Sequence, residues 1–291
     1  MTYKDKPFEK KVLYAKKPEW LKVQMPIGEE YQKIKQMMRT NSLHTVCEEA
    51  HCPNIGECWG SGTATFLVLG DVCSRNCRFC AVTSGKPTLP DPMEPKNIAE
   101  SVFKMHLAHT VITSVTRDDL PDGGAEHWRQ IVIETRKLNP KTTIEVLIPD
   151  FMGKQEQYSI VFSADPDILN HNVETVPRLY PTVRPKANFN NSLRLLKDAK
   201  EYGLKTKTGF MVGLGETKEE VIDIMKQLRK NEVSILTIGQ YLQPTKAHLA
   251  VSRYVTPAEF VEYKKIGLEM GFLHVESAPL VRSSYHAKDQ V

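Results

Sequence analysis

The segment TFLVLGDVCSRNCRFC, residues 65–80, decides the fold, because an apolar run leads directly into three closely spaced cysteines. Residues 65–72 are nearly continuous in apolar side chains, as in a strand that is buried on both faces. Cys73, Cys77 and Cys80 follow with the spacing C-x3-C-x2-C. The segment therefore predicts a buried strand that ends in a metal-binding loop.

Five more apolar runs follow, and amphipathic stretches of helical period separate them. The runs are residues 109–115, 143–149, 167–172, 207–215 and 234–242. This alternation is typical of a parallel sheet covered by helices. Six units predict an α/β fold, a partial (β/α)6 barrel of the TIM type, in preference to a doubly wound sheet. We expect an N-terminal extension over residues 1–62, the barrel over 63–272 and a C-terminal extension over 273–291.

All six cysteines of the chain lie between residues 47 and 80. Cys47, Cys52 and Cys58 form a second triplet with the different spacing C-x4-C-x5-C. Thiolates select zinc or iron–sulfur clusters, and zinc usually takes four protein ligands. Three thiolates suit a 4Fe–4S cluster that leaves one iron for another ligand. Disulfides are the alternative, but they occur mainly in small secreted domains.

The composition limits the classes of function. A net charge of +4 over 291 residues argues against a dedicated nucleic-acid-binding protein. The N-terminal stretch MTYKDKPFEKK lacks the apolar core of a signal peptide, and no later stretch approaches the ~20 apolar residues of a membrane span. We therefore expect a cytoplasmic chain, with a monomer as the default. The GLGE stretch at 213–216 lacks the spacing of a phosphate-binding loop.

Polar and glycine residues cluster where the predicted strands end, which is where parallel barrels carry their chemistry. The candidates are Gly123, Gly124, Glu145, Asn170, His171 and Asn172. Each has a plainer interpretation. A glycine pair commonly forms a turn, and His171 suits a hydrogen-bonded core position equally well.

The loop at 73–80, with Phe79 before its third cysteine, resembles the radical S-adenosylmethionine (SAM) superfamily, as does GFMVGLGE at 209–216. The resemblance implies that Cys73, Cys77 and Cys80 hold a 4Fe–4S cluster whose open iron binds SAM. Reductive cleavage of SAM would then give a 5′-deoxyadenosyl radical. The implied SAM contacts are Gly123 and Gly124 at the methionine amino group, Phe79 near the adenine, and Glu145, Asn170 and Asn172 at the sulfonium and ribose.

The first cysteine triplet resembles the lipoyl synthase family, as do RDDLPDGGA, VPRLYPTVRP, GQYLQP and VRSSYHA, over residues 21–288. The resemblance implies that Cys47, Cys52 and Cys58 hold an auxiliary 4Fe–4S cluster with a serine as its fourth ligand. Ser284 is the expected ligand and Ser283 is the alternative.

The resemblance also implies a reaction, in which two sulfur atoms enter C6 and C8 of an octanoyl chain on a lysine of a lipoyl carrier domain. Two SAM molecules would be consumed, and the auxiliary cluster would supply the sulfur. The implied partners are E2 subunits of 2-oxo acid dehydrogenases or H-type proteins of glycine cleavage, a ferredoxin or flavodoxin, and an iron–sulfur carrier protein. Alternatives are a methylthiotransferase, a biotin synthase-like enzyme, and a non-enzymatic iron–sulfur or zinc scaffold.

Basic side chains offer two further hypotheses. Lipoyl carrier domains are commonly acidic, so Lys10, Lys11, Lys16 and Lys17 would steer such a partner by complementary charge. Arg178 and Arg184 are candidates for contact with a substrate or cofactor carboxylate, and structural salt bridges are the alternative.

Overall fold

The computed structural model describes residues 17–23, 28–41, 43–60 and 65–290. Across these residues one sheet of eight strands pairs in chain order. The strands are β1 (His44–Thr45), β2 (Thr65–Val68), β3 (His109–Ser114), β4 (Thr143–Leu147), β5 (Ile168–Asn170), β6 (Lys205–Val212), β7 (Ile235–Gln240) and β8 (His274–Ser277). β1 is antiparallel to β2, and β2 to β8 are parallel. All six predicted strands are present, and β8 is a seventh parallel strand that the pattern did not indicate.

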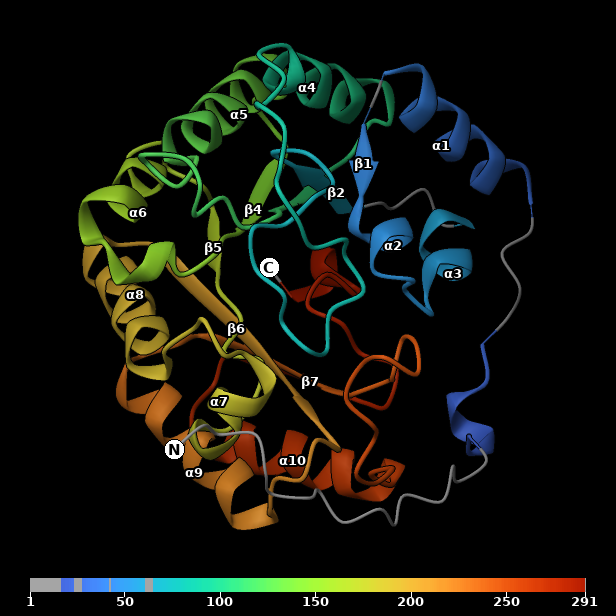
Figure 1. The fold of residues 1–291 in the computed structure, drawn as a ribbon, viewed down its shortest axis with the longest axis vertical. Coiled ribbons are helices and arrows are strands. Elements are labelled where there is room, and N and C mark those ends of the chain that lie inside the picture. The colour runs from blue at the N-terminus through green and yellow to red at the C-terminus, as the bar shows by residue number, and fades with distance from the viewer. Residues whose placement is uncertain (1–16, 24–27, 42, 61–64, 291) are drawn as a thin grey trace.

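Helices form a ring outside the parallel strands (Figure 1). The six that alternate with the strands are α4 (Glu94–Lys104), α5 (Ala125–Leu138), α6 (Gln155–Phe162), α8 (Phe189–Tyr202), α9 (Lys218–Lys230) and α10 (Pro257–Glu269). The others are α1 (Glu29–Thr40), α2 (Val46–Glu49), α3 (Ile55–Gly60), α7 (Tyr180–Val183), η1 (Glu19–Leu21), η2 (Phe151–Gly153), η3 (Pro177–Leu179) and η4 (Ala287–Gln290). Within the described residues no pairing joins β1 to β8. The fold is therefore the expected partial barrel.

Local sequence explains why the helices begin where they do. In α9 and α10 a threonine caps the first turn and a glutamate three residues later bonds back, at Thr217–Glu220 and Thr256–Glu259. The buried face of α9 follows the helical period, with Val221, Ile224, Met225 and Leu228. These faces pack against the strands, and both expected extensions add an edge strand to the sheet, β1 and β8.

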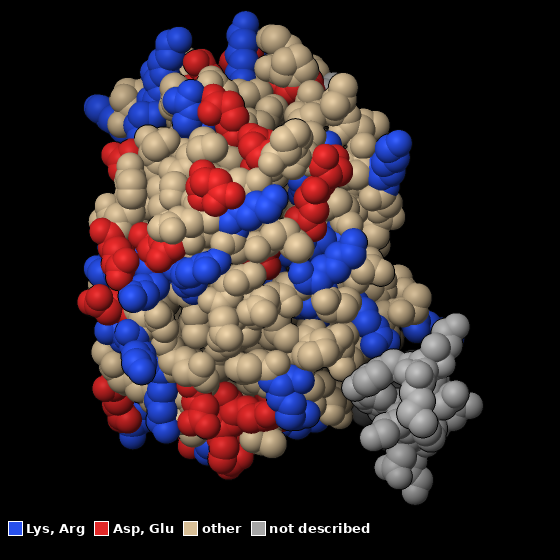
Figure 2. All heavy atoms as spheres, turned by 60° about the vertical axis from the view of Figure 1, so that its left-hand side comes forward, with Lys and Arg blue, Asp and Glu red and all other residues tan. Residues whose placement is uncertain are grey.

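The outer surface carries charges of both signs. Figure 2 shows Lys and Arg interspersed with Asp and Glu on the face turned toward the viewer. Many of these side chains form exposed pairs, such as Lys197 with Glu201 at 3.4 Å. Among the described helices none is long and apolar enough to cross a lipid bilayer.

A buried ion pair and one hydrogen bond to it join three strands inside the barrel. Lys207 Nζ on β6 lies 2.9 Å from Glu145 Oε1 on β4, and both side chains are fully buried. Asn170 on β5 donates to the same carboxylate at 2.8 Å. Lys207 and His109 hold the pKa of Glu145 below its usual range although burial opposes this. The charges thus compensate each other in an interior where either alone would be costly.

We expect Lys207→Met to destabilise the apo-protein by about 3–5 kcal/mol, because it leaves a buried carboxylate without its cation. Urea unfolding followed by circular dichroism measures the change. Lys197→Met removes an exposed pair and serves as the control, with a cost below about 1 kcal/mol. Equal losses for the two variants would contradict the interpretation of the buried pair.

Candidate functional site

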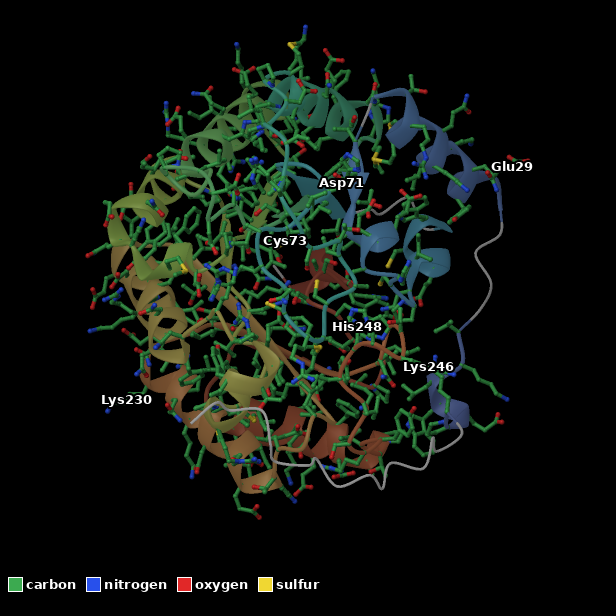
Figure 3. The ribbon with its side chains drawn as sticks, viewed as in Figure 1. Glu29, Asp71, Cys73, Lys230, Lys246 and His248 are labelled. Carbon is green, nitrogen blue, oxygen red and sulfur yellow. The ribbon has the colours of Figure 1, made fainter. Side chains whose placement is uncertain are left out.

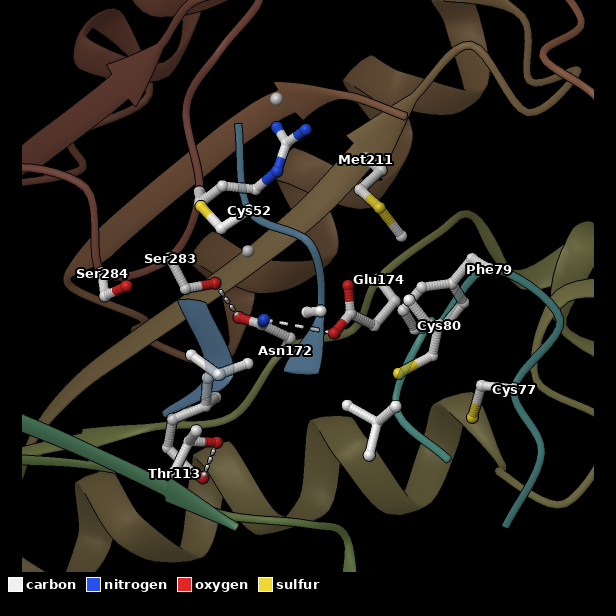
Figure 4. A pocket seen from close by; sticks show the side chains of 18 of the residues that line it. Cys52, Cys77, Phe79, Cys80, Thr113, Asn172, Glu174, Met211, Ser283 and Ser284 are labelled. Atoms are coloured by element: carbon white, nitrogen blue, oxygen red, sulfur yellow. Dashed lines mark hydrogen bonds between the residues drawn. The ribbon is translucent and has the colours of Figure 1, made fainter. Parts of the chain in front are cut away.

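A cavity of about 600 Å³ lies where the parallel strands end. Its wall includes residues 113–116 at the end of β3, 147–149 at the end of β4, 171, 172 and 174 after β5, and 241–244 after β7. Both cysteine triplets reach it, through Cys73, Cys77 and Cys80 and through Cys47 and Cys52. Figure 4 shows Cys77, Phe79 and Cys80 on one side of Asn172 and Glu174, with Cys52, Ser283 and Ser284 on the other. The two predicted metal sites therefore share one cavity.

The loop of the second triplet is tied to the ends of β3 and β4. Arg75 forms ion pairs with Asp118 at 2.6 Å and with Asp150 at 2.7 Å. These carboxylates outweigh burial and raise the pKa of Arg75 above its usual range. The sulfur of Cys73 accepts backbone N–H bonds from Thr116 at 3.3 Å and from Arg75 at 3.4 Å. Such donors stabilise a metal-bound thiolate and tune its cluster.

The same loop is held from the other side of the cavity. His248 Nε2 donates to the carbonyl oxygen of Cys80 at 2.8 Å, and its Nδ1 lies 2.9 Å from the Thr245 hydroxyl. Leu249 N donates to the carbonyl oxygen of Arg78 at 3.1 Å. Figure 3 shows Cys73 and His248 inside the ring of helices. The cysteine loop is therefore preorganised by the segments that follow β3, β4 and β7.

The first triplet lies on the short helices α2 and α3, which carry Cys47 and Cys58, and on the turn between them, which carries Cys52. Burial first, and the neighbouring Cys52 second, raise the pKa of Cys47 to about 11. Burial followed by Cys47 and Cys52 raises the pKa of Cys58 to about 12. Thiols that repel one another as thiolates favour a metal that compensates their charge. Within the described residues no group of three His, Cys, Asp or Glu side chains could hold a single metal ion. Three thiolates suit a larger iron–sulfur cluster, and the second triplet offers the same donor set.

The C-terminal segment lies on the side of the cavity that carries the first triplet. Asn54 Nδ2 donates to the carbonyl oxygen of Leu280 at 2.7 Å, and Tyr285 donates to Glu57 at 3.0 Å, so the segment lies against the first triplet. Both expected serine candidates line the cavity. The Ser283 hydroxyl donates to Asn172 Oδ1 at 2.9 Å. Sequence alone could not distinguish the two serines, and in the structure the hydroxyl hydrogen of Ser283 is used in this bond.

Only some of the predicted SAM contacts reach the cavity. Phe79 and Asn172 line it, whereas Gly123, Gly124, Glu145 and Asn170 are not among the described residues of its wall. The last two belong to the buried ion-pair network. The glycine pair forms the turn that leads into α5, with φ of +65° and +84°, and a Cβ at Gly124 would lie 2.8 Å from Leu69 Cδ1. The turn interpretation of this pair accounts for its position, and residues 114–116 occupy the wall after β3 instead.

Two charged residues line the wall in addition. Glu174 was not predicted, and Arg184 was predicted either as a ligand contact or as part of a structural salt bridge. Glu174 accepts from Asn172 Nδ2 at 3.2 Å, and burial raises its pKa. Arg184 is buried and donates to the carbonyl oxygen of Asn172 at 3.0 Å. Arg178 instead pairs with Glu220 at 2.7 Å on the surface. The available signal for Glu174 was its place just after the fourth predicted strand.

The barrel agrees with what other proteins show. A model of the radical SAM superfamily matches residues 67–228, so the chain belongs to that superfamily. Two solved structures have a similar fold. SuiB of Streptococcus suis, bound to S-adenosylmethionine, has a TM-score of 0.59 at 11% identity over 86% of this chain and 56% of that one. HydG, a maturase of the FeFe-hydrogenase, has a TM-score of 0.51 at 13% identity over 73% and 55%.

Relatives of higher sequence identity define the family within this superfamily. A model of the N-terminal domain of lipoyl synthase matches residues 1–52. The lipoyl synthase of Rubrobacter xylanophilus is 57% identical over 94% of this chain and 86% of its own length. That of Pelodictyon phaeoclathratiforme is 56% identical over 94% of each. The chain belongs to the lipoyl synthase family, and it is a radical SAM sulfurtransferase whose cofactors are SAM and two 4Fe–4S clusters.

His171 supports the cavity wall as a neutral side chain. Its Nδ1 donates to the carbonyl oxygen of Ile148 at 2.8 Å, and its Nε2 accepts from the Ser192 hydroxyl at 2.9 Å. Burial, followed by the nearby Arg184, lowers the pKa of His171 to about 4. In the unfolded chain His171 binds a proton near pH 6.5, whereas in the folded chain it stays neutral until the pH falls to about 4.

We expect the stability of the apo-protein to fall as pH drops from 6.5 to 4, because only the unfolded state gains the proton of His171. The loss from this residue is at most about 3 kcal/mol. Urea unfolding at several pH values measures it. His171→Gln offers a donor and an acceptor but no titration, so it should show a shallower acid slope. The same slope in both proteins would contradict the assignment.

Proposed function

We propose that Cys73, Cys77 and Cys80 hold the cluster that binds SAM, with Phe79 and Asn172 in contact with that cofactor. When bound, this cluster delivers the electron that cleaves SAM to a 5′-deoxyadenosyl radical, which abstracts hydrogen from an unactivated C–H bond. The surrounding wall supports this role. Arg184 and Glu174 place one cation and one carboxylate beside Asn172, suited to the charged methionine end of SAM.

We further propose that Cys47, Cys52, Cys58 and Ser284 hold the auxiliary cluster. Ser284 is the better candidate because the hydroxyl of Ser283 is already bonded to Asn172. Serine oxygen is a harder ligand than thiolate, so this corner of the cluster is the most easily opened. Arg282 lies close enough to Cys52 to lower its pKa, although burial dominates and raises it. A buried cation at this place offsets the negative charge of the bound thiolates.

The reaction is the insertion of two sulfur atoms at C6 and C8 of a protein-bound octanoyl-lysine. The auxiliary cluster is the sulfur donor and is therefore consumed as a substrate. The observation that carries this function is that both cysteine triplets face one cavity, so an alkyl chain entering it lies between the hydrogen-abstracting group and the sulfur source. Enclosure in an apolar wall also keeps water from the radical.

The protein substrate is an octanoylated protein. We propose that it is a lipoyl domain of a 2-oxo acid dehydrogenase E2 subunit or an H-type protein of glycine cleavage. A ferredoxin or flavodoxin would supply electrons and an iron–sulfur carrier protein would rebuild the consumed cluster. We propose a cytoplasmic monomer, since reduced thiolates persist in a reducing compartment.

The function is tested by anaerobic turnover of reconstituted protein with reductant, SAM and an octanoyl-lysine peptide. We expect the peptide to gain two sulfur atoms while the protein loses one cluster. Cys52→Ala should still form 5′-deoxyadenosine but no thiolated peptide, and Cys77→Ala should form neither. Mass spectrometry of the peptide and chromatography of the nucleoside measure both products. If Cys52→Ala thiolates the peptide as the unchanged protein does, the sulfur comes from elsewhere.

We expect the positive charges of Lys10, Lys11, Lys16 and Lys17 to assist docking of an acidic carrier domain. Lys17 lines the cavity, whereas Lys10, Lys11 and Lys16 lie outside the described residues. Replacing all four by glutamine should raise the apparent Kd for an acidic carrier domain about three- to tenfold at low salt, and the difference should vanish near 1 M salt. Titration calorimetry measures both values. Lys197→Gln together with Lys226→Gln, on distant helices, is the control, and unchanged binding of the fourfold variant at low salt would refute the hypothesis.

A further inference from the structure

The segment 278–284 lies against the ends of β6 and β7, in a space that two glycines leave open. Ala278 N donates to the carbonyl oxygen of Ile238 at 3.2 Å, and Gln240 N donates to that of Pro279 at 3.2 Å. A Cβ at Gly239 would lie 2.1 Å from the carbonyl oxygen of Val281. This glycine has no left-handed φ, so the close approach of the backbone, not the conformation, requires it.

Gly209 on β6 has a similar role one strand away. A Cβ there would lie 2.3 Å from Thr237 Oγ1, 3.0 Å from Asn172 Oδ1 and 3.2 Å from Ser283 Oγ. The missing side chain at Gly209 therefore leaves room for the hydrogen bond between Ser283 and Asn172. Figure 4 shows this bond at the centre of the cavity, continuing from Asn172 to Glu174.

The opposite side of the segment contacts the auxiliary cysteines. Asn54, between Cys52 and Cys58, binds the carbonyl oxygen of Leu280 at 2.7 Å. Ser284 follows Ser283 directly, so its position depends on where Ser283 is fixed. A serine ligand on an unrestrained segment would lose conformational entropy when it binds the cluster. A segment that is already fixed in the folded protein does not incur this cost on binding.

We propose that Gly239 and Asn172 are positioning residues for the serine ligand. Gly239 admits the segment 278–284 into the barrel, and Asn172 fixes Ser283 so that Ser284 faces the auxiliary cysteines. This inference rests on the proposed function of Ser284. It also makes Asn172 a shared element, because the same side chain lies in the half of the cavity that we assign to SAM.

Release of the segment is measured by trypsin cleavage after Arg282 in the apo-protein. That bond is cleaved only when the segment leaves the barrel, so the rate reports the open population. We expect Ser283→Ala to raise the rate about fivefold, as loss of one hydrogen bond allows. Gly239→Ala should raise it at least as much. Ser283→Thr keeps the hydroxyl and Ser252→Ala changes an exposed serine, so both should cleave at the unchanged rate.

The second measurement uses protein in which Cys73, Cys77 and Cys80 are alanine, so that only the auxiliary cluster is reconstituted. Adding Ser283→Ala should speed iron loss to a chelator about fivefold and alter the Mössbauer signal of the unique iron, while Ser283→Thr should restore both. The inference is overturned if Ser283→Ala matches the unchanged protein in cleavage and iron retention, or if only Gly239→Ala has an effect. If cleavage and iron loss rise as expected but the unchanged enzyme forms no thiolated peptide, the positioning role stands and the proposed function fails.

Discussion

The parallel pairing of β2 to β8 is the constraint on which the rest of the structure depends. It brings the carboxyl end of every parallel strand to one rim, so segments distant in sequence meet around a single cavity. The loop at 73–80 follows β2, Asn172 and Glu174 follow β5, and the segment 278–284 follows β8. Because β1 and β8 do not pair within the described residues, the sheet stays open where both flanking segments enter.

The sequence predicted the barrel because its central strands are buried on both faces and therefore read as continuous apolar runs. β8 escaped detection because it has only four residues, His274–Ser277, and Val275 is its single apolar side chain. β1 has two residues, too few for any periodicity. The cysteine triplets could be named as candidate metal ligands from the sequence, since their spacing is local. Contacts that join distant segments, such as Ser283 with Asn172, leave no local pattern and became visible only in three dimensions.

The predicted SAM contacts show the same limit. Of the residues expected from their position after a strand, Asn172 lines the cavity, whereas Gly123 and Gly124 are not among the described residues of its wall. The glycine pair leads into α5, and steric closeness to Leu69 accounts for the second glycine. Glu145 lies one layer deeper than the cavity wall, where Lys207 compensates its charge. Strand register separates wall residues from core residues, and apolar patterning in a strand buried on both faces does not reveal register.

The contact between Asn54 and Leu280 spans 226 positions of the chain, and it has a consequence for the order of assembly during synthesis. The loop at 73–80 has all three of its thiols as soon as the first parallel strand is made. The first triplet gains its contacts with Leu280 and Tyr285 only after these residues have left the ribosome. Premature metal capture by Cys47, Cys52 and Cys58 would therefore meet an unfinished binding site. The contacts of the first triplet with residues 280–285 are therefore among the last to form as the chain is synthesised.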